Sequence, residues 1–460
     1  MSLDPKMEHV ELQEDAFSDI EQLSREQLRE LQWTRLQRQV AYNFRNSPYY
    51  RRSMEAVGMR PEDLKSWEDH ARVPSMDKHD HRAAQEESLA RFGHPFGMLV
   101  CKPLEALVML SGTSGTTGLP TFYTVTARDL TLYSRLMARK LRRIGLRPGD
   151  RVLHGFSLSM MVGGQPLLQT LMNYGACVVP IGAEVGSRRL LEFAKLVKPR
   201  AMVCTPSYAE YLAENCMEVL GRPIKDLGLE LLMCGGEPGA GLPTVRARIE
   251  GAYGARLHDY TGVIHTFHGI SCGAPDAWMH FTSEDYCVLE LRDPDTRKPI
   301  PVQDGAIGEM LYTELGIEAT PLMRYALGDV ISISTRPCSC CGWRGISFKI
   351  LGRADDMLIV KGVNVYPAAI RTVVASLTPR TTGQIRIQLD QPGHKVTPPL
   401  RLVVEHGEGV SEDQLPALKT ELEALLHDQV KVRPDIRLVA PGSLARTHHK
   451  TKIIEVLAQD

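Results

Sequence analysis

The sequence predicts a two-part α/β protein, with a large domain of layered strands and helices followed by a small α+β domain. Between residues 101 and 315, short apolar runs alternate with amphipathic helical stretches, which is the pattern of α/β layers. After Gly352 the pattern changes to short strands separated by two helices, over 367–377 and 415–430. A chain of 460 residues also exceeds what one compact core usually organises, so two or three units are expected.

The pattern divides the chain near residues 95 and 352. Residues from about 19 to 57 are polar with helical spacing, and Ser24 with Gln27 has the spacing of a capping box. We expect residues 1–95 to pack on the core as a helical region, followed by a large domain over 96–352 and a small domain over 353–460. Three apolar runs in the large domain are typical of buried strands: 176–181, 201–205 and 229–233.

Composition excludes several classes of function. Hydrophobic residues make up 43% and charged residues 24% of the chain, as in ordinary soluble proteins, and the net charge is −1. A nucleic-acid binder normally carries a basic excess, so no nucleic-acid partner is expected. No apolar run approaches the ~20 residues that span a bilayer, and residues 1–5 lack the features of a signal peptide. Ten cysteines are too few for a secreted disulfide scaffold, so we expect a cytoplasmic protein without a membrane partner.

The most informative stretch is the Ser/Gly/Thr-rich segment over residues 111–120. Its glycines let the backbone curl so that N–H groups converge on phosphate oxygens, and its hydroxyl side chains add donors. The segment lacks the G-x-x-x-x-G-K-[ST] arrangement of P-loop nucleotide hydrolases. A flexible linker has a similar composition, but it would not usually stand between an apolar strand (106–110) and a helix capped by Thr126. We therefore expect a phosphate-binding loop.

At this loop the chain resembles the phenylacetate–CoA ligase family of adenylate-forming enzymes. The family's loop reads S-S-G-T-T-G-K-P where this chain has residues 113–120. Further segments match in the same order, between about residues 30 and 455: 46–52, 234–238, 324–329, 352–357 and 442–450. Each match alone is weak, but the ordered set is specific. The resemblance implies a ligase that uses ATP to adenylate a carboxylic acid, passes the acyl group to coenzyme A, and releases AMP and pyrophosphate.

The resemblance also implies which residues contact the nucleotide. The triphosphate would be bound by backbone N–H groups and hydroxyls of the loop residues Ser114, Gly115, Thr116, Thr117 and Gly118. Further nucleotide contacts are implied for Gly236, Glu237 and Pro238 of an adenine-binding turn, for Asp259, and for Asp329 and Arg353 at the ribose.

The resemblance implies roles for two residues of the small domain, Lys450 in catalysis and Asp355 as a hinge. Lys450 would bridge the acid carboxylate and the α-phosphate, where negative charge builds up during attack. The small domain would then rotate about the hinge residue Asp355, and the face with residues 361–362 would meet the thiol of coenzyme A.

The chain departs from the family at the phosphate loop. Leu119 stands where the family usually has a lysine, so one cation near the β- and γ-phosphates is missing. Either Lys78 or Arg128 is the cation that could compensate.

A second departure concerns magnesium. The family's D-x-Y-G-x-[ST]-E becomes residues 259–265 here, with Thr261 for the aromatic, Ile264 for the hydroxyl and His265 for the magnesium-binding glutamate. The resemblance places His265 at the catalytic position of this glutamate, but a neutral imidazole is a poor ligand for this hard cation. Either Mg²⁺ is held mainly by the ATP phosphates, or the loop has a different register, or adenylation is slow or specialised.

Three clustered cysteines predict a structural zinc site. C-x-x-C-G and C-x-C spacings over residues 338–342 suit a tetrahedral knuckle. Some members of the resembled family hold zinc with a cysteine, a histidine and such a pair, which correspond here to Cys272, His280, Cys338 and Cys341. Cys340 is the alternative in the pair, and reduced unliganded thiols are the other interpretation.

Residues 155–164 resemble the family segment that lines the acid pocket. Gly163 and Gly164 would allow close approach of a flat ring, and Phe156 and Met160 would supply apolar walls. An aromatic or aryl-alkanoic acid is therefore the expected substrate, although a glycine-rich turn in the core has the same composition.

Other interpretations remain open at the level of sequence. Relatives of this fold pass the acyl group to a carrier-protein thiol or an amine, or adenylate a deazaflavin, but with no carrier domain in this chain coenzyme A is the simplest acceptor. A nucleotide-binding regulatory relative without turnover is supported by the altered 261–265 segment and opposed by Lys450. A metal-binding scaffold would account for the cysteines alone. The family resemblance also allows a homodimer, for which the sequence gives no separate signal.

Overall fold

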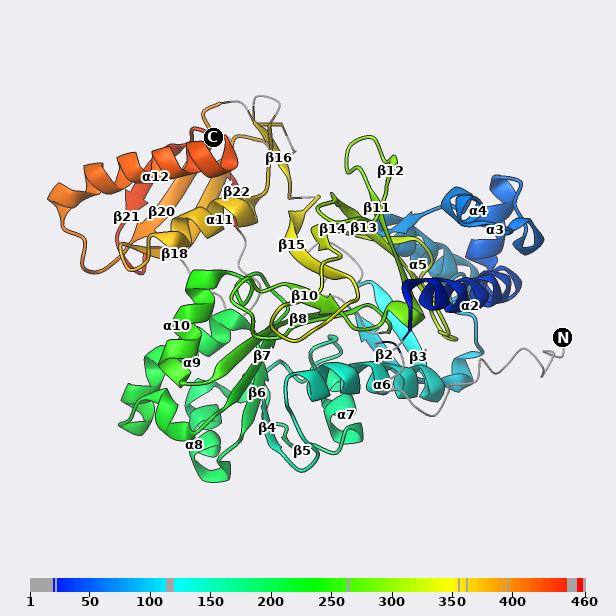
Figure 1. Cartoon of the computed structure of the whole chain (residues 1–460), viewed down its shortest axis with the longest axis horizontal. Coiled ribbons are helices and arrows are strands. Elements are labelled where there is room, and N and C mark those ends of the chain that lie inside the picture. Colours follow the sequence, from blue (N-terminus) through cyan, green and yellow to red (C-terminus); the bar gives the residue numbers. More distant parts are fainter. Residues whose placement is uncertain are drawn as a thin grey trace.

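The structure, a computed structural model of the chain, describes residues 20, 23–112, 120–262, 265–354, 356–360, 363–391, 393, 395–396, 398–444 and 453–457. They form a large α/β domain and a small C-terminal α+β domain (Figure 1), which confirms the predicted fold class. Among these residues no helix has the length and apolar character needed to cross a membrane.

A thirteen-stranded mixed sheet runs through the large domain. Its parallel part holds β4 (Arg151–His154), β5 (Cys177–Val179), β6 (Ala201–Cys204), β7 (Leu231–Gly235) and β8 (Arg256–Gly262). The associated helices are α6 (Ala127–Arg143), α7 (Gln165–Asn173), α8 (Ser187–Val197), α9 (Pro206–Leu220) and α10 (Pro243–Tyr253). Every residue of β6 and β7 is buried, as expected for parallel strands covered by helices. β5 and β6 lie where strands were predicted, and β7 begins two residues later than predicted.

The antiparallel part continues the same sheet from β8. It contains β9 (His268–Ser271), β10 (Met279–Phe281), β15 (Ser347–Arg353), β14 (Tyr325–Ser334), β13 (Ile307–Glu314), β11 (Cys287–Arg292) and β12 (Pro299–Ile300) in spatial order, with β1 (Met76–Asp77) on β14. A separate two-stranded hairpin, β2 (Leu107–Gly112) with β3 (Phe122–Thr126), flanks the predicted phosphate loop.

The described part of the N-terminal segment, from residue 23 on, is largely helical. Its helices are α2 (Arg25–Asn46), α3 (Pro48–Ala56), α4 (Trp67–Arg72) and α5 (Lys78–Phe92). Short 3₁₀ helices lie at Pro61–Asp63, Leu104–Ala106, Ala183–Val185, Ile224–Leu227, Glu284–Tyr286 and Glu412–Gln414. Ser24 and Gln27 form the predicted capping box at the start of α2. Buried polar side chains then fix α2 on the core, because Gln32 and Arg35 donate to the carbonyls of Glu284 and Asp285 (2.6 and 2.7 Å).

The small domain has a core of its own. Its two sheets contain β17 (Val363–Val365), β16 (Leu358–Val360) and β19 (Lys395–Val396), and β21 (Asp435–Val439), β20 (Arg401–His406), β18 (Thr381–Leu389) and β22 (Ile454–Val456). Two helices, α11 (Pro367–Ser376) and α12 (Leu415–Val430), complete it. Leu418, Leu422 and Leu426 of α12 are buried at successive helical turns, as the leucine spacing predicted. In Figure 1 this domain lies beside α10 and β15.

Asp285 ties the N-terminal helices to the large domain through a buried charge cluster. Arg139 of α6 donates to both its carboxylate oxygens (2.7 and 3.0 Å), and Arg35 of α2 lies 3.5 Å away. Burial opposes ionisation of Asp285, but the charge and hydrogen bonds of Arg139, with the charge of Arg35, outweigh it and lower the pKa of Asp285.

We expect Asp285→Ala to lower the free energy of unfolding by about 3–5 kcal/mol, because it removes a buried carboxylate that binds two guanidinium groups. The midpoint of urea unfolding measures this. Asp390→Ala is the matched control: its ion pair with Arg401 is exposed on both sides, so its loss should cost about 0–1 kcal/mol. Equal midpoints for the two variants would contradict the role of the cluster.

Candidate active site

The hairpin β2–β3 fixes both ends of the predicted phosphate loop. Ser114, Gly115, Thr116, Thr117, Gly118 and Leu119 lie outside the described residues. Gly112 pairs with Phe122 at the end of the hairpin next to the loop. Buried Gln85 of α5 donates to the carbonyl of Pro120 (2.9 Å) and accepts from the N–H of Phe122 (2.8 Å). The backbone leaving the loop is therefore held by a side chain as well as by strand pairing.

The predicted acid-pocket segment docks against this hairpin. The carbonyl of Met160 accepts from the N–H of Gly112 (3.1 Å) and the hydroxyl of Ser111 (2.6 Å). Gly164 is required for a tight turn, because a Cβ there would lie 2.3 Å from the carbonyl oxygen of Ser159. The structure thus brings the loop-flanking strand and the pocket segment together.

The predicted adenine turn follows β7. Gly236 has a positive φ of 86°, which glycine adopts without strain. Glu237 accepts from the N–H of Ser207 (2.8 Å) at the start of α9, where a carboxylate also favours the helix dipole. The carbonyl of Pro238 accepts from Arg371 of α11 (3.4 Å), so the turn contacts the small domain.

Asp329 and Arg353, the predicted ribose contacts, lie side by side. They are paired residues on β14 and β15, and Arg353 Nη1 donates to Asp329 Oδ1 (3.3 Å). Arg353 also donates to the carbonyl of Leu327 (2.9 Å). Both side chains are partly exposed, at 23% for Arg353 and 21% for Asp329. β15 ends at Arg353, and the predicted hinge residue Asp355 and the predicted catalytic lysine Lys450 lie outside the described residues.

Asp259 sits beneath the adenine turn in a poorly solvated position. It is the fourth residue of β8, and its backbone N–H donates to Ser271 Oγ (2.8 Å). A Cβ on Gly241 would approach its Oδ2 to 2.7 Å. Burial raises the pKa of Asp259 to about 7, and the charge of Arg246 opposes this only in part.

His265 is fully buried, and both of its ring nitrogens face hydrogen-bond acceptors. Nδ1 lies 2.9 Å from Glu314 Oε2, and Nε2 lies 3.3 Å from the carbonyl oxygen of Thr124. Neither nitrogen is open toward a ligand. Arg128, one of the cations expected to replace the loop lysine, forms an ion pair with Glu318 (2.7 Å).

The four predicted zinc ligands converge. The ligand atoms of Cys272, His280, Cys338 and Cys341 all lie within 4.8 Å of one another. Cys272 Sγ and Cys338 Sγ are 3.7 Å apart, close to the ~3.8 Å expected for two sulfurs bound at ~2.3 Å to one tetrahedral ion. His280 Nε2 faces Cys341 Sγ, and its Nδ1 is held by the hydroxyl of Ser347 (2.9 Å), which fixes the ring. The donor set fits zinc, and Cys341 rather than Cys340 belongs to it.

The sequence analysis did not identify two buried residues of charged type near His265, one of which contacts it directly and the other through His268. Glu314, the last residue of β13, and Lys140, on the inner side of α6, are both 0% exposed. Lys140 follows Leu136 and Met137 and precedes Leu141, so it interrupts the apolar face of a predicted helix. A charge at such a position is a signal, because burial of a charge requires compensating contacts.

Comparisons with known proteins identify the class. The AMP-binding enzyme family matches residues 60–317, and its C-terminal domain family matches residues 362–455. The chain is therefore an AMP-binding, adenylate-forming enzyme.

Whole-length relatives narrow the class to one family. A phenylacetate-coenzyme A ligase of Thermus thermophilus is 31% identical over 445 residues, covering 93% of this chain and 96% of that protein. The chain belongs to the phenylacetate–CoA ligase family, and it is an AMP-forming ligase that joins a carboxylic acid to coenzyme A at the expense of ATP. Solved 2-hydroxyisobutyryl-CoA ligase structures are similar along the chain. The postadenylation state with 2-HIB-AMP has a TM-score of 0.84 at 29% identity, and the thioesterification state with CoA has 0.67 at 30%; each covers 99% of this chain and 95% of that one.

We expect Asp259→Asn to raise the melting temperature of the ligand-free protein more at pH 8 than at pH 5. With a folded pKa of about 7 and an unfolded value of about 3.9, the folded state binds this proton more tightly. Asp259 therefore subtracts stability as the pH rises from about 4 to about 7, and the amide does not. An equal difference at both pH values would contradict the raised pKa.

Proposed function

We propose that this acid–CoA ligase acts on an aromatic or aryl-alkanoic acid. The observation that carries the proposal is the position of Phe156, whose ring lies against Gly163 of the pocket segment and Gly236 of the adenine turn. A Cβ on these glycines would stand 3.2 and 3.8 Å from the ring. Phe156 therefore places an aromatic wall where the acid segment meets the nucleotide segment, and a flat ring packs well on such a wall. Met160, 41% exposed, adds a polarisable surface beside it.

Several roles in the reaction are part of this proposal. The loop between β2 and β3 holds the ATP phosphates, Asp259 and the turn Gly236-Glu237-Pro238 lie on the adenosine side, and Asp329 with Arg353 holds the ribose. Lys450 neutralises charge between the carboxylate and the α-phosphate, where a fixed cation lowers the barrier most.

We infer that residues 353–460 move as a unit about Asp355 between the two half-reactions, with residues 1–95 and 96–352 staying together. The two TM-scores support this, since 2-hydroxyisobutyryl-CoA ligase has a TM-score of 0.84 in the postadenylation state and 0.67 in the thioesterification state. Coenzyme A is the proposed acceptor, as in the named relatives, and a carrier-protein thiol, an amine or a deazaflavin are the alternatives. All ten cysteine thiols are free, which suits a reducing cytoplasm.

A panel of acids tests the substrate class. We expect pyrophosphate release with phenylacetate and benzoate to exceed that with 2-hydroxyisobutyrate and with long-chain fatty acids, and acyl-CoA to form when coenzyme A is added. Phe156→Ala should lower kcat/KM for the aryl acids at least tenfold, because it removes the wall on which the ring packs.

The aliphatic hydroxy acid is the competing candidate, because the similar solved ligase is named for it. Met172→Ala, at an exposed position on α7, is the matched control and should leave every acid unchanged. Higher activity on 2-hydroxyisobutyrate than on every aryl acid would defeat the aromatic proposal and leave the ligase activity intact.

We also propose that Cys272, His280, Cys338 and Cys341 hold one structural Zn²⁺. A closed Cys₃His set leaves no open position for substrate, so the ion would stabilise the loop after β14.

Cys338→Ser should remove zinc from the purified protein, as measured by elemental analysis, whereas Cys340→Ser should retain it. The reason is that Cys340 lies outside the converging set. Zinc-free wild-type protein purified without chelators would overturn this proposal.

A further inference from the structure

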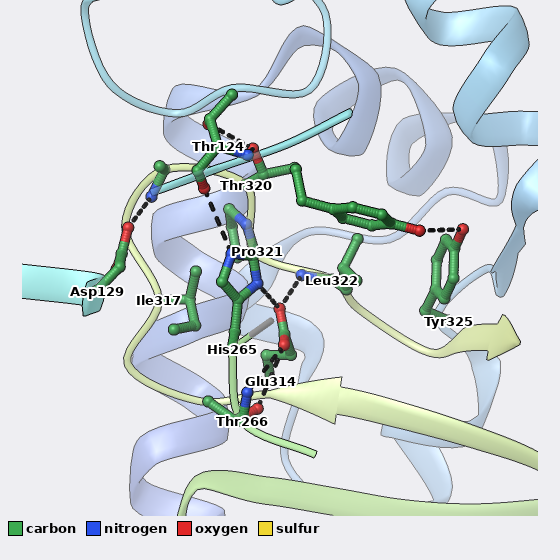
Figure 2. Close-up of polar contacts among 12 residues, drawn as sticks. Thr124, Asp129, His265, Thr266, Glu314, Ile317, Thr320, Pro321, Leu322 and Tyr325 are labelled. Carbon is green, nitrogen blue, oxygen red and sulfur yellow. Dashed lines mark hydrogen bonds and ion pairs between the residues drawn. The ribbon is translucent and has the colours of Figure 1, made fainter. Parts of the chain in front are cut away.

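His265 and Glu314 form a fully buried polar pair between the hairpin β2–β3 and the main sheet (Figure 2). This hairpin, which flanks the predicted phosphate loop, is called the phosphate hairpin below. Both side chains are 0% exposed, and they lie 2.9 Å apart. Charged groups are rarely placed in such positions unless every partner is satisfied, since desolvation is costly. The partners of each group define its charge.

Both carboxylate oxygens of Glu314 accept hydrogen bonds. Oε1 accepts from the N–H and the hydroxyl of Thr266 (3.3 and 3.4 Å), and Oε2 accepts from the N–H of Leu322 (3.1 Å) in addition to His265. Because a backbone N–H can only donate, each of the two oxygens faces at least one fixed donor.

With Glu314 as a carboxylate, a protonated His265 accounts for both of its ring contacts. A carbonyl oxygen can only accept, so Nε2 must donate to Thr124, and Nδ1 faces a carboxylate. A neutral imidazole carries one N–H and cannot satisfy both contacts. Burial alone would lower the pKa of His265, but the charge and hydrogen bond of Glu314, with the more distant charge of Asp129, raise it above the usual value.

The pair joins three separate segments. Thr124 lies on β3, which follows the phosphate loop, Glu314 ends β13, and Leu322 precedes β14, the strand that carries Asp329. The hydroxyl of Thr320 bonds that of Thr124 (2.7 Å) across the same junction. Figure 2 shows His265 between Thr124 and Glu314. The two sides of the proposed nucleotide site are thereby connected through one imidazolium.

A second buried hydrogen bond fixes the backbone of His265. Its carbonyl accepts from His268 Nε2 (2.9 Å), and Lys140 Nζ lies 3.0 Å from His268 Nδ1 and 3.4 Å from the carbonyl oxygen of Thr261. Of the groups described around His265, Glu314 and Asp129 favour its charge, whereas His268, with Lys140 behind it, opposes it. The anion in direct contact dominates.

The position therefore does not fit a magnesium ligand. Mg²⁺ requires an available oxygen lone pair or, less well, a neutral imidazole nitrogen, and His265 offers neither. Glu314 is buried and already accepts four hydrogen bonds, so it does not replace the missing glutamate.

We propose that His265 is a positioning residue that, as an imidazolium bound to Glu314, fixes the phosphate hairpin against β13 and β14 and takes no part in binding Mg²⁺. The metal ion is then bound with ATP through its phosphates. Adenylation depends on this junction, whereas transfer of an existing acyl-AMP to coenzyme A does not.

Half-reaction kinetics of His265→Gln, Glu314→Gln and the double variant test the proposal. Each single variant should lower the rate of acyl-AMP formation at least tenfold and leave thioesterification from supplied acyl-AMP within twofold of wild type. The double variant should recover part of the loss, because two amides restore a neutral hydrogen bond without an uncompensated charge. His70→Gln is the matched control: His70 is also buried near β13, bonding Thr313, but burial lowers its pKa to about 4, so it is neutral.

The Mg²⁺ and pH dependence separate positioning from metal binding. At a fixed ATP concentration, the Mg²⁺ concentration that gives half-maximal adenylation should agree within twofold between wild type and His265→Gln. Loss of a metal ligand would raise this concentration tenfold or more. Because the pKa of His265 is raised, wild-type adenylation should fall on the alkaline side as the imidazolium loses its proton, and the double variant should lack that decline.

Three results would overturn the proposal. The first is a tenfold rise in the Mg²⁺ requirement of His265→Gln. The second is full adenylation activity in His265→Glu, which should instead be impaired, since it places two carboxylates together in the core. Equal losses in both half-reactions, with a lowered melting temperature, would reduce the pair to a structural contact and also count against it.

Discussion

The phosphate hairpin depends on buried polar contacts, since its two strands belong to a small sheet separate from the main one. Hydrophobic packing alone does not set the register of so short an element, because apolar contacts are not directional. Gln85 fixes the strand after the loop, the carbonyl of Met160 fixes the strand before it, and His265 with Glu314 fixes its inner side. The two strands that flank the proposed phosphate loop are thus held by oriented hydrogen bonds whose loss leaves buried groups without partners.

In the proposed mechanism, this construction allows one site to serve two reactions. The main sheet of the large domain carries Asp329 and leads into the proposed adenine turn, and the separate hairpin is hydrogen-bonded to this domain. The small domain has its own core and contacts the turn through Arg371. Preorganised donors are effective in adenylation because they cost no rearrangement when charge develops. A separately folded domain can change its contacts without disturbing that arrangement.

Much of this organisation was predictable from the sequence, because it follows local rules. Alternating apolar runs predicted the layered domain, the leucine spacing predicted α12, and the Ser24–Gln27 capping box predicted the start of α2. The convergence of Cys272 and His280 with the distant cysteine pair came from resemblance, since four residues on separate strands and loops have no common period. The His265–Glu314 contact was not predictable, because the two residues are 49 positions apart and neither signals its partner. The sequence shows a histidine in the place of a carboxylate, but the charge of this histidine follows from its contacts with Glu314 and Thr124 in the fold.

The charge of His265 is the most direct test of the account. ¹⁵N NMR of histidine-labelled protein, with His265→Gln used to assign the signal, reports the protonation of each ring nitrogen. The account predicts that both nitrogens carry protons at pH 7.5, as Thr124 and Glu314 require. A neutral ring with one unprotonated nitrogen at that pH would contradict it.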